Sequence, residues 1–287
     1  MIFKPIKYLS LVKFSHTIFA MPFALIGFFL ATEDISTPID WKLFIYVILC
    51  MIFARNSAMA FNRFADREID KKNFRTAKRE IPLGIIKANS ALLFVIINTL
   101  LFVFTTYLIN NICFYLSPVA LIIILGYSFT KRFTALCHFI LGIGLSLAPI
   151  GAYLSVSGNF SLIPIIFSFI VLFWVSGFDI IYALQDDEFD ISQNLKSIPV
   201  FLGKHKALIL SAVLHTLSAI LVIYAGYLAN FKLYYWIGTI IFIGLLFYQH
   251  LIVKPNDISK VNIAFATTNG IGSIIFAFFT ILELLLN

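Results

Sequence analysis

The chain has 287 residues, of which 61% are hydrophobic and only 12% are charged. Soluble domains are about half apolar and about a quarter charged, so a water-soluble globule could not bury this much apolar surface. The composition therefore predicts a polytopic membrane protein. The net charge of +7 does not indicate nucleic-acid binding, which would need a basic face on a soluble domain.

Nine apolar stretches are long enough to cross a bilayer, because a hydrocarbon core needs about 20 apolar residues of helix. They are continuously apolar rather than alternating, which favours helices over the strands of a barrel. The first is too long for the apolar region of a signal peptide, and no cleavage site follows it. We therefore expect an all-α fold with one membrane-embedded domain over residues 1–287. The expected spans are 12–32, 42–62, 89–109, 112–130, 134–156, 161–185, 206–229, 233–253 and 262–285.

The basic residues divide unequally between the two sides that nine spans define. Eighteen of the 21 Lys and Arg residues fall at the N-terminus and in the even-numbered loops. Only Lys42 and Lys232 fall on the other side, and Arg55 lies within a span. Because cytoplasmic loops carry the excess of Lys and Arg, the N-terminus is expected in the cytoplasm. The two long polar loops, 63–88 and 186–205, are expected on the same side.

Acidic residues gather in two short clusters, after the second and the sixth span, which together hold eight of the fourteen Asp and Glu residues. In the first cluster, "NRFADREID", Asn62, Asp66 and Asp70 are spaced i, i+4, i+8. This spacing places them on one face of a continuous helix. Arg55 lies seven residues before Asn62 and shares that face, deeper in the membrane.

The second cluster, "DIIYALQDDEFD", has the same pattern. Asp179, Tyr182, Asp186 and Asp190 run i, i+3, i+7, i+11, again along one helix face of about three turns. Acidic side chains within a membrane are costly and usually functional, and like charges on one helix face repel each other. The two rows therefore need a common source of positive charge.

A divalent cation between the two rows is the simplest way to stabilise them. Oxygen ligands favour Mg²⁺ over zinc, and Mg²⁺ commonly completes its shell with phosphate oxygens and water. A diphosphate is therefore the expected substrate class, and nearby basic side chains could bind it, with Arg doing so bidentately. These side chains are Arg75, Lys78, Arg79, Lys131 and Arg132. The alternative is that both clusters are solvated loops and that the basic residues only anchor the chain.

The two acidic motifs resemble those of the UbiA superfamily of membrane prenyltransferases. The patterns N-x-x-x-D-x-x-x-D and D-x-x-Y-A-x-x-D-x-x-x-D occur in the same order in that superfamily. Further similarity lies in "RTAKREIPLG" (75–84), "YSFTKRFT" (127–134) and "KSIPVFLG" (196–203). The likeness covers nearly the whole chain and is greatest to 4-hydroxybenzoate polyprenyltransferases and to relatives that act on hydroxynaphthoates.

The resemblance implies a ring of nine helices around a cytoplasm-facing cavity, in the inner membrane of a bacterium. It implies Mg²⁺-dependent transfer of a polyprenyl group from a polyprenyl diphosphate to the ring of an aromatic hydroxy acid. The acceptor would be 4-hydroxybenzoate in ubiquinone synthesis or a dihydroxynaphthoate in menaquinone synthesis. Membrane lipid is the expected surrounding, with a lipid-facing opening that admits the polyprenyl tail.

The same resemblance assigns roles to individual residues. Metal ligation falls to Asn62, Asp66, Asp70, Asp186 and Asp190. The four Asp residues are also expected to be catalytic, together with Lys131 and Tyr127 near the diphosphate and the forming carbocation. Asp179 and Tyr182 would line the cavity beside them, and Arg75 is a further candidate for binding substrate.

Two positions depart from the family pattern. Many members have Asp directly after the Asn of the first motif, where this chain has Arg63, and relatives often have Gly where it has Asn194. Arg63 could bind the diphosphate or a carboxylate of the acceptor, and Arg55 could do the same. Arg63 and the stretch "AMAFNR" slightly favour a dihydroxynaphthoate as acceptor.

The histidines give little guidance. His16, near the start of the first span, is as consistent with a packing role as with substrate binding. The other four histidines are scattered and show no spacing typical of metal ligands.

A membrane transporter is the main alternative function. Transporters place charges at mid-depth, often in broken helices or inverted repeats, whereas the acids here lie at helix ends on one side. A phosphoalcohol transferase is a second alternative, but its Asp-Gly-rich motif is missing because no Asp here is followed by Gly. Transport of a substrate without chemical turnover would favour the transporter.

Overall fold

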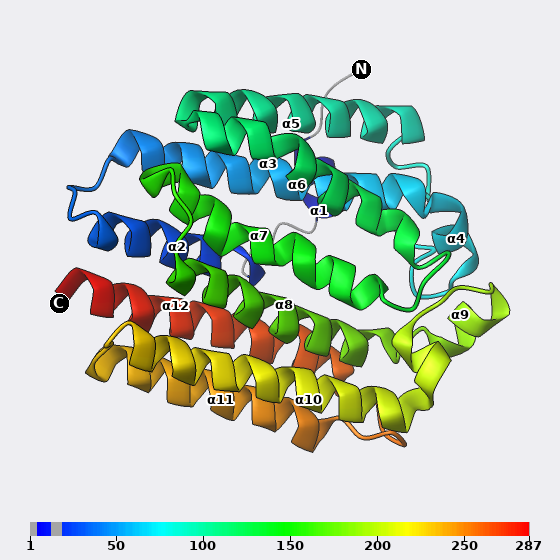
Figure 1. Ribbon diagram of the computed structural model, residues 1–287. Coiled ribbons are helices and arrows are strands. Elements are labelled where there is room, and N and C mark those ends of the chain that lie inside the picture. Colours follow the sequence, from blue (N-terminus) through cyan, green and yellow to red (C-terminus); the bar gives the residue numbers. More distant parts are fainter. Residues whose placement is uncertain (1–4, 13–18, 287) are drawn as a thin grey trace.

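The computed structural model describes residues 5–12 and 19–286, which form a bundle of helices (Figure 1). The predicted all-α class is confirmed, since the only strand-like pairing among these residues is an isolated bridge between Lys254 and Asp257. In chain order the helices are α1 (Pro5–Leu11), α2 (Met21–Asp34), α3 (Trp41–Ala65), α4 (Arg67–Lys72), α5 (Ala88–Ile109), α6 (Asn111–Thr130), α7 (Cys137–Ser157), α8 (Leu162–Ala183), α9 (Asp187–Ser192), α10 (Ile198–Leu228), α11 (Leu233–Ile252), the π-helical turn η2 (Ile263–Thr268) and α12 (Asn269–Leu286).

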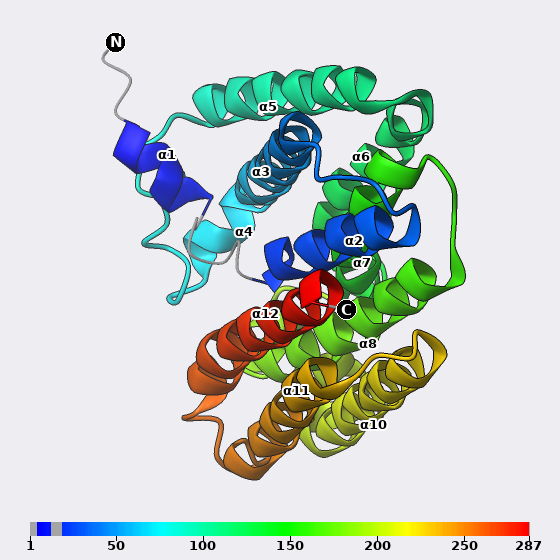
Figure 2. The ribbon, with the colours of Figure 1, turned by 90° about the vertical axis from the view of Figure 1, so that its left-hand side faces the viewer.

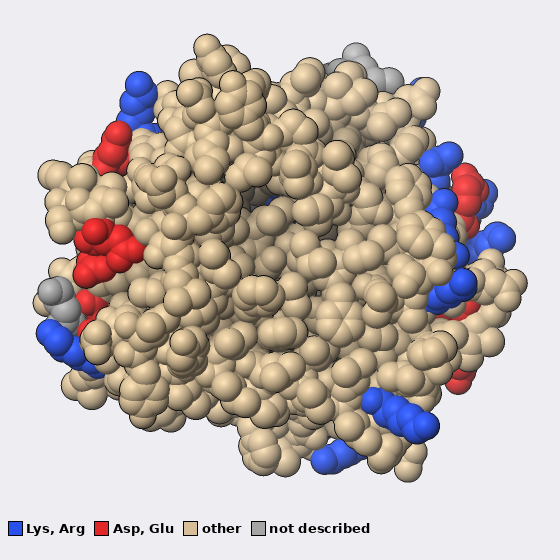
Figure 3. All heavy atoms as spheres, viewed as in Figure 1, with Lys and Arg blue, Asp and Glu red and all other residues tan. Residues whose placement is uncertain are grey.

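Eight helices in the described part of the chain are long and apolar enough to cross a membrane, namely α3, α5, α6, α7, α8, α10, α11 and η2 with α12. The ninth expected span, 12–32, includes residues 13–18, which lie outside the described residues; α2 is its described helix. Figure 3 shows a broad uncharged band across the molecule, with charged side chains gathered at its two ends. The chain is an integral membrane protein.

The long helices run side by side and bring the two acidic motifs to one end of the bundle. Helices α3, α5 and α6 form one part of the bundle, α10 and α11 lie at the far edge, and α2, α7 and α8 stand between them (Figure 2). The short helices α4 and α9 lie at the same end (Figure 1). They approach each other closely enough for Lys72 of α4 to donate a hydrogen bond to Gln193, directly after α9, at 3.3 Å.

Aromatic side chains fill the core between α2, α8, α11 and α12, and a small polar cluster lies within them. The indole N–H of Trp174 and the side-chain amide of Gln249 both donate to Asn269 Oδ1 at 2.8 Å. Asn269 Nδ2 in turn donates to the carbonyls of Ala264 and Phe265 in η2. These bonds satisfy polar groups at the irregular junction of η2 and α12, where lipid could not replace them.

Both acidic motifs interrupt their helices, so the prediction of one continuous helix face is wrong at each. Asp66 has φ −93° and ψ 6° and separates α3 from α4, while Asp186, with φ −111° and ψ 4°, directly precedes α9. These angles lie in the bridge region, outside the helical region. In both motifs the N–H of the later acid, Asp70 or Asp190, still donates to the carbonyl of the earlier one at 2.7 Å. The i, i+4 relation therefore survives each break.

Two helical segments meet within α10 at Gly203, whose φ of 76° and ψ of 160° are not helical. The longer segment follows Gly203, so it begins close to residue 206, as predicted for this span. Asn194, just after α9, has φ 54°. Asn tolerates this left-handed conformation better than most residues. The backbone conformation at position 194 is thus one that both Asn and Gly adopt.

The packing of α2 against α7 depends on Gly27. A Cβ atom at this position would lie 2.1 Å from the carbonyl oxygen of Pro149 in α7, far inside van der Waals contact. Only glycine lets the two helices approach this closely.

We predict that Gly27→Ala lowers the melting temperature of the detergent-solubilised protein, because overpacking of this kind typically costs about 1–3 kcal/mol. Gly151→Ala in α7 is the matched control, since its added Cβ would meet nothing within 4 Å. Ala is favoured over Gly inside a helix by roughly 0.5–1 kcal/mol, so the control should melt at the same temperature or slightly higher. Equal melting temperatures for the two variants would show that the contact with Pro149 does not limit stability.

Candidate active site

A polar cavity of about 170 Å³ lies at the end of the bundle that carries α4 and α9. Ten of the predicted site residues line it: Asn62, Asp66, Asp70, Arg75, Tyr127, Lys131, Asp179, Tyr182, Asp186 and Asp190. Its volume is below the roughly 300–1,000 Å³ of most ligand pockets. Basic side chains occupy much of the space between the acids.

The first acid, Asp66, faces the turn between α6 and α7. Its Oδ2 accepts a hydrogen bond from Asn62 Nδ2 at 3.1 Å, and its Oδ1 lies 3.3 Å from Arg132 Nη2. The same guanidinium nitrogen donates to the carbonyl of Ala65 at 2.7 Å. Arg132 therefore joins the α6–α7 turn to the broken end of α3.

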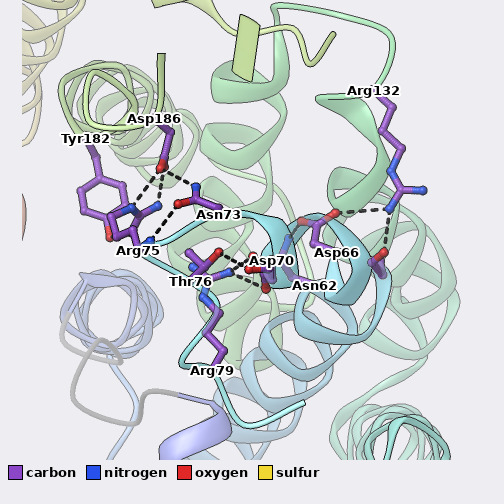
Figure 4. Close-up of polar contacts among 11 residues, drawn as sticks. Asn62, Asp66, Asp70, Asn73, Arg75, Thr76, Arg79, Arg132, Tyr182 and Asp186 are labelled. Atoms are coloured by element: carbon purple, nitrogen blue, oxygen red, sulfur yellow. Dashed lines mark hydrogen bonds and ion pairs between the residues drawn. The ribbon is translucent and has the colours of Figure 1, made fainter. Parts of the chain in front are cut away.

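The second acid, Asp70, is held by the loop that follows α4. Its carboxylate is almost fully buried, and Arg79 Nη1 lies 2.6 and 2.7 Å from its two oxygens. Thr76 Oγ1 donates to the Asp70 carbonyl at 3.1 Å. Figure 4 shows that Arg79 and Thr76 approach Asp70 together.

The same loop reaches across the cavity to the second motif. Arg75 pairs with Asp186 through both Nε, at 3.0 Å from Oδ1, and Nη2, and its Nη1 donates to the Tyr182 hydroxyl at 2.9 Å. Asn73 Nδ2 adds a further hydrogen bond to Asp186 Oδ1 at 2.9 Å (Figure 4). Two side chains of this loop therefore bind Asp186, directly before α9, while Arg79 of the same loop binds Asp70 in α4.

Asp190 is fully buried and pairs with Lys131, whose Nζ lies 2.7 Å from Oδ2. Among the described residues, neither oxygen of Asp190 accepts a hydrogen bond of good geometry. Lys131 follows α6 directly, and its carbonyl accepts a hydrogen bond from the Lys196 N–H at 2.7 Å. The lysine is thus fixed between the α6–α7 turn and the loop before α10.

The acids differ in how well their charge is compensated. Burial raises the pKa of Asp66, and the nearby charge of Asp70 raises it further. Burial also raises the pKa of Asp190, in spite of Lys131. For Asp186, burial is outweighed by the hydrogen bonds and charge of Arg75, so its pKa falls below the ordinary value. Asp66 and Asp190 would therefore be stabilised by additional positive charge.

The donor set fits Mg²⁺ in its chemistry, because it consists of carboxylate and amide oxygens. The incompletely compensated oxygens of Asp190 and Asp66 point to the same conclusion. In the arrangement seen here, however, no three acidic, His or Cys side chains of the described residues converge on one metal position. A cation would therefore have to bind as the basic side chains change partners.

Two of the predicted residues that the structure describes are not brought to the cavity wall. Arg55 and Arg63 lie on α3 outside the lining, and Arg63 is 4% exposed. Arg55 Nε and Arg63 Nε and Nη1 are buried and make no hydrogen bond within the described part of the chain. Their role in substrate binding stays a prediction. His16 lies outside the described residues.

Comparison with known proteins agrees with this geometry. Residues 20–279 match the model of the UbiA prenyltransferase family. The chain belongs to the UbiA prenyltransferase family. The resemblance expected from its two acidic motifs is thereby confirmed.

Relatives of known name and structure extend the match within the UbiA family. A 4-hydroxybenzoate octaprenyltransferase of Aliivibrio fischeri (strain MJ11) is 30% identical over 251 residues, covering 86% of this chain and 85% of the relative. An apo structure of a UbiA homolog from Aeropyrum pernix K1 superposes with a TM-score of 0.84 at 29% identity, over 93% of this chain and 98% of the other. A UbiA homolog from Archaeoglobus fulgidus bound to GPP and Mg²⁺ has the same fold, with a TM-score of 0.77 at 23% identity over 98% and 100% of the two chains.

Two residues at this UbiA-family site escaped sequence reasoning. Asn73 lies just beyond the first motif, in a segment that gives no periodic signal. His138 looked isolated in the sequence, but its Nδ1 lies 2.7 Å from Asp179 Oδ2, and both residues line the cavity. Their separation of 41 positions leaves no local pattern to detect.

We predict that Arg75→Ala increases the rate at which trypsin cleaves loop 73–87, because the variant loses the contacts that hold the loop to Asp186 and Tyr182. Lys78→Ala is the control, since Lys78 is exposed in the same loop and its only described contact is with the ring of Phe74. Both variants remove one tryptic site. The rates of cleavage after Lys71 and Arg79, sites that both variants keep, are therefore compared. A faster rate in Arg75→Ala would show that the loop is released from the cavity. Equal rates for the two variants would contradict a loop held by Arg75.

Proposed function

We propose that this chain is a Mg²⁺-dependent aromatic polyprenyltransferase. It would transfer a polyprenyl group from a polyprenyl diphosphate to the ring of an aromatic hydroxy acid in ubiquinone or menaquinone biosynthesis. The observation that carries the proposal is the meeting of two acidic pairs, from α3–α4 and α8–α9, in one cavity lined by Arg and Lys. The Aliivibrio relative bears the name of this activity, and the Archaeoglobus homolog holds GPP with Mg²⁺.

In this proposal Mg²⁺ is held by Asn62, Asp66 and Asp70 on one side and by Asp186 and Asp190 on the other. When bound, Mg²⁺ supplies positive charge that stabilises the leaving diphosphate. The donor atoms are carboxylate and amide oxygens from the end of α3, from the short helices α4 and α9, and from the residues that precede these two.

The basic residues of the cavity bind the diphosphate. Arg75, Arg79, Lys131 and Arg132 each pair with one acid. Phosphate oxygens are strong acceptors for such groups, and Arg binds them bidentately. We therefore expect these side chains to exchange a carboxylate for a phosphate oxygen, which also enlarges the cavity. Preorganised positive charge of this kind favours cleavage of the allylic C–O bond.

Aromatic faces beside the diphosphate site stabilise the resulting allylic cation. Tyr127 and Tyr182 line the cavity, and Tyr182 stacks on Phe265 with ring centroids 4.1 Å apart. The apolar bundle below them keeps water from the cation. The polyprenyl tail would extend toward the lipid.

The acceptor carboxylate is proposed to bind a buried arginine of α3, with Arg55 as the first candidate and Arg63 as the second. His16 remains a candidate for substrate binding. Arg63 and "AMAFNR" favour a dihydroxynaphthoate, whereas the name of the Aliivibrio relative favours 4-hydroxybenzoate. We place the protein in the inner membrane of a bacterium, with its N-terminus and the cavity facing the cytoplasm, because Lys and Arg predominate in the loops on that side.

We predict that the purified protein, given farnesyl diphosphate, Mg²⁺ and an aromatic hydroxy acid, yields a prenylated acid detectable by mass spectrometry. EDTA, Asp66→Ala and Asp186→Ala should each reduce the rate at least ~100-fold, since electrostatic stabilisation of this kind is typically worth 10²–10³. Glu68→Gln is the control, because the Glu68 side chain is 76% exposed and its variant should keep full activity. Movement of labelled substrate across vesicles without product formation would instead support a transporter.

We further predict that Arg55→Gln raises the KM for the acceptor about 10-fold or more and leaves the KM for the diphosphate unchanged, because a charge-assisted hydrogen bond contributes roughly 1.5–3 kcal/mol. Arg63→Gln, assayed in parallel against 4-hydroxybenzoate and dihydroxynaphthoates, shows whether the second arginine shares the task. A change confined to the KM for the diphosphate would reassign Arg55 to the other substrate.

A further inference from the structure

One acid of the cavity differs from the other four in its partner. Asp66, Asp70, Asp186 and Asp190 each pair with Arg or Lys. Asp179 pairs instead with a histidine, and no Lys or Arg of the described residues lies within ion-pair distance of it. A carboxylate bound to a cation is a poor proton acceptor, so Asp179 is the cavity carboxylate best suited to receive a proton.

Hydrogen bonds at both ring nitrogens position the histidine. The backbone N–H of Ile198, at the start of α10, donates to His138 Nε2 at 3.2 Å. Because a backbone N–H can only donate, this bond uses the Nε2 lone pair and leaves the ring proton on Nδ1. Nδ1–H therefore donates to Asp179 Oδ2, 2.7 Å away.

Helix packing holds this pair in position. Gly142 of α7, one turn beyond His138, lets α8 approach so closely that an added Cβ would lie 2.4 Å from Ser176 Oγ and 2.7 Å from the Leu172 carbonyl oxygen. Ser176 Oγ also lies within hydrogen-bond distance of the His138 carbonyl, at 3.3 Å. His138 is 2% exposed, whereas 17% of the Asp179 side chain is exposed to the cavity. The histidine is thus a buried support, and the carboxylate is the group that a substrate can reach.

The depth of Asp179 suits a group that acts on the acceptor rather than on the diphosphate. Asp179 lies within α8, about one turn before its end at Ala183, whereas Asp186 follows that end and directly precedes α9. Asp186 and its arginine mark the diphosphate end of the cavity, so Asp179 lies deeper, beside Tyr127 and Tyr182 in the lining.

We propose that Asp179 accepts the proton that the acceptor ring releases on prenylation, and that His138 is the positioning residue that orients this carboxylate. The inference rests on the proposed prenyl transfer. In the step, the allylic C–O bond breaks and its electron pair leaves with the diphosphate, while a π pair of the acceptor ring forms the new C–C bond. The C–H electron pair of the substituted carbon then returns to the ring, and its proton passes to Asp179 and from there to water.

The test compares kcat for protiated and ring-perdeuterated acceptor, measured separately at saturation with farnesyl diphosphate and Mg²⁺. The probe is 4-hydroxybenzoate or, where only that class reacts, a dihydroxynaphthoate. In Asp179→Asn, loss of the ring proton should become rate-limiting. We expect kcat to fall by about 10²–10⁴-fold, the usual contribution of a general base, and the deuterium isotope effect on kcat to rise above that of the wild type.

Variants of His138 separate positioning from folding. His138→Gln can still accept from Ile198 and donate to Asp179, so it should keep near-wild-type kcat and isotope effect. His138→Leu keeps a buried apolar side chain but loses both bonds, so it should lower kcat, raise the isotope effect and leave both KM values unchanged. A merely structural role for His138 would change the melting temperature and the amount of active protein, without changing the isotope effect.

The outcomes distinguish this inference from the function on which it rests. Absence of product from the wild type with every acceptor would refute the proposed function, and with it the roles proposed for Asp179 and His138. Product from the wild type, together with an unchanged isotope effect in Asp179→Asn and His138→Leu, would refute the roles of Asp179 and His138 and leave the proposed function standing. In that case the leaving diphosphate or water would be the proton acceptor.

Discussion

Neutralisation of four carboxylates at one end of a membrane bundle is the constraint on which the rest of the structure depends. Leaving a buried carboxylate such as Asp70, Asp186 or Asp190 without its partner costs about 3–5 kcal/mol. The pairs are Asp66–Arg132, Asp70–Arg79, Asp186–Arg75 and Asp190–Lys131. Three of them join different segments of the chain, so the ion pairs that neutralise the acids also close the polar end of the bundle.

The same pairs account for both states that the proposed chemistry needs. Guanidinium and ammonium groups lie between the acids and compensate their charge, which explains the small volume of the cavity. In the proposed mechanism a bound cation and a diphosphate would give each acid and each base a new partner of opposite charge, so no charge would be left buried alone. Asp179 stands outside this exchange because its partner is the imidazole of His138 rather than an Arg or Lys. In the proposed mechanism Asp179 accepts a proton, while the other four acids bind cationic groups.

The sequence predicted much of this arrangement because strong local patterns carry it. Continuous apolar runs located the membrane helices, and the spacing of Asn62, Asp66 and Asp70 located one wall of the cavity. Helix breaks at Asp66 and Asp186 were missed, because a turn that preserves i, i+4 spacing leaves the periodicity intact. The partners of the acids could not be assigned either. Arg75 has Asp186 as its partner only because loop 73–87 crosses the cavity, and His138 meets Asp179 only because Gly142 lets α7 and α8 touch.

The central claim is that the two acidic motifs form one site for a divalent cation together with a diphosphate. Its most direct test is an electron paramagnetic resonance titration with Mn²⁺ as the substitute for Mg²⁺, in the presence and absence of an unreactive thio-analogue of farnesyl diphosphate. We expect weak Mn²⁺ binding to the protein alone, tight binding with the analogue, and hyperfine coupling of the bound ion to phosphorus. Mn²⁺ that binds equally well without the analogue, or that shows no coupling to phosphorus, would contradict the account.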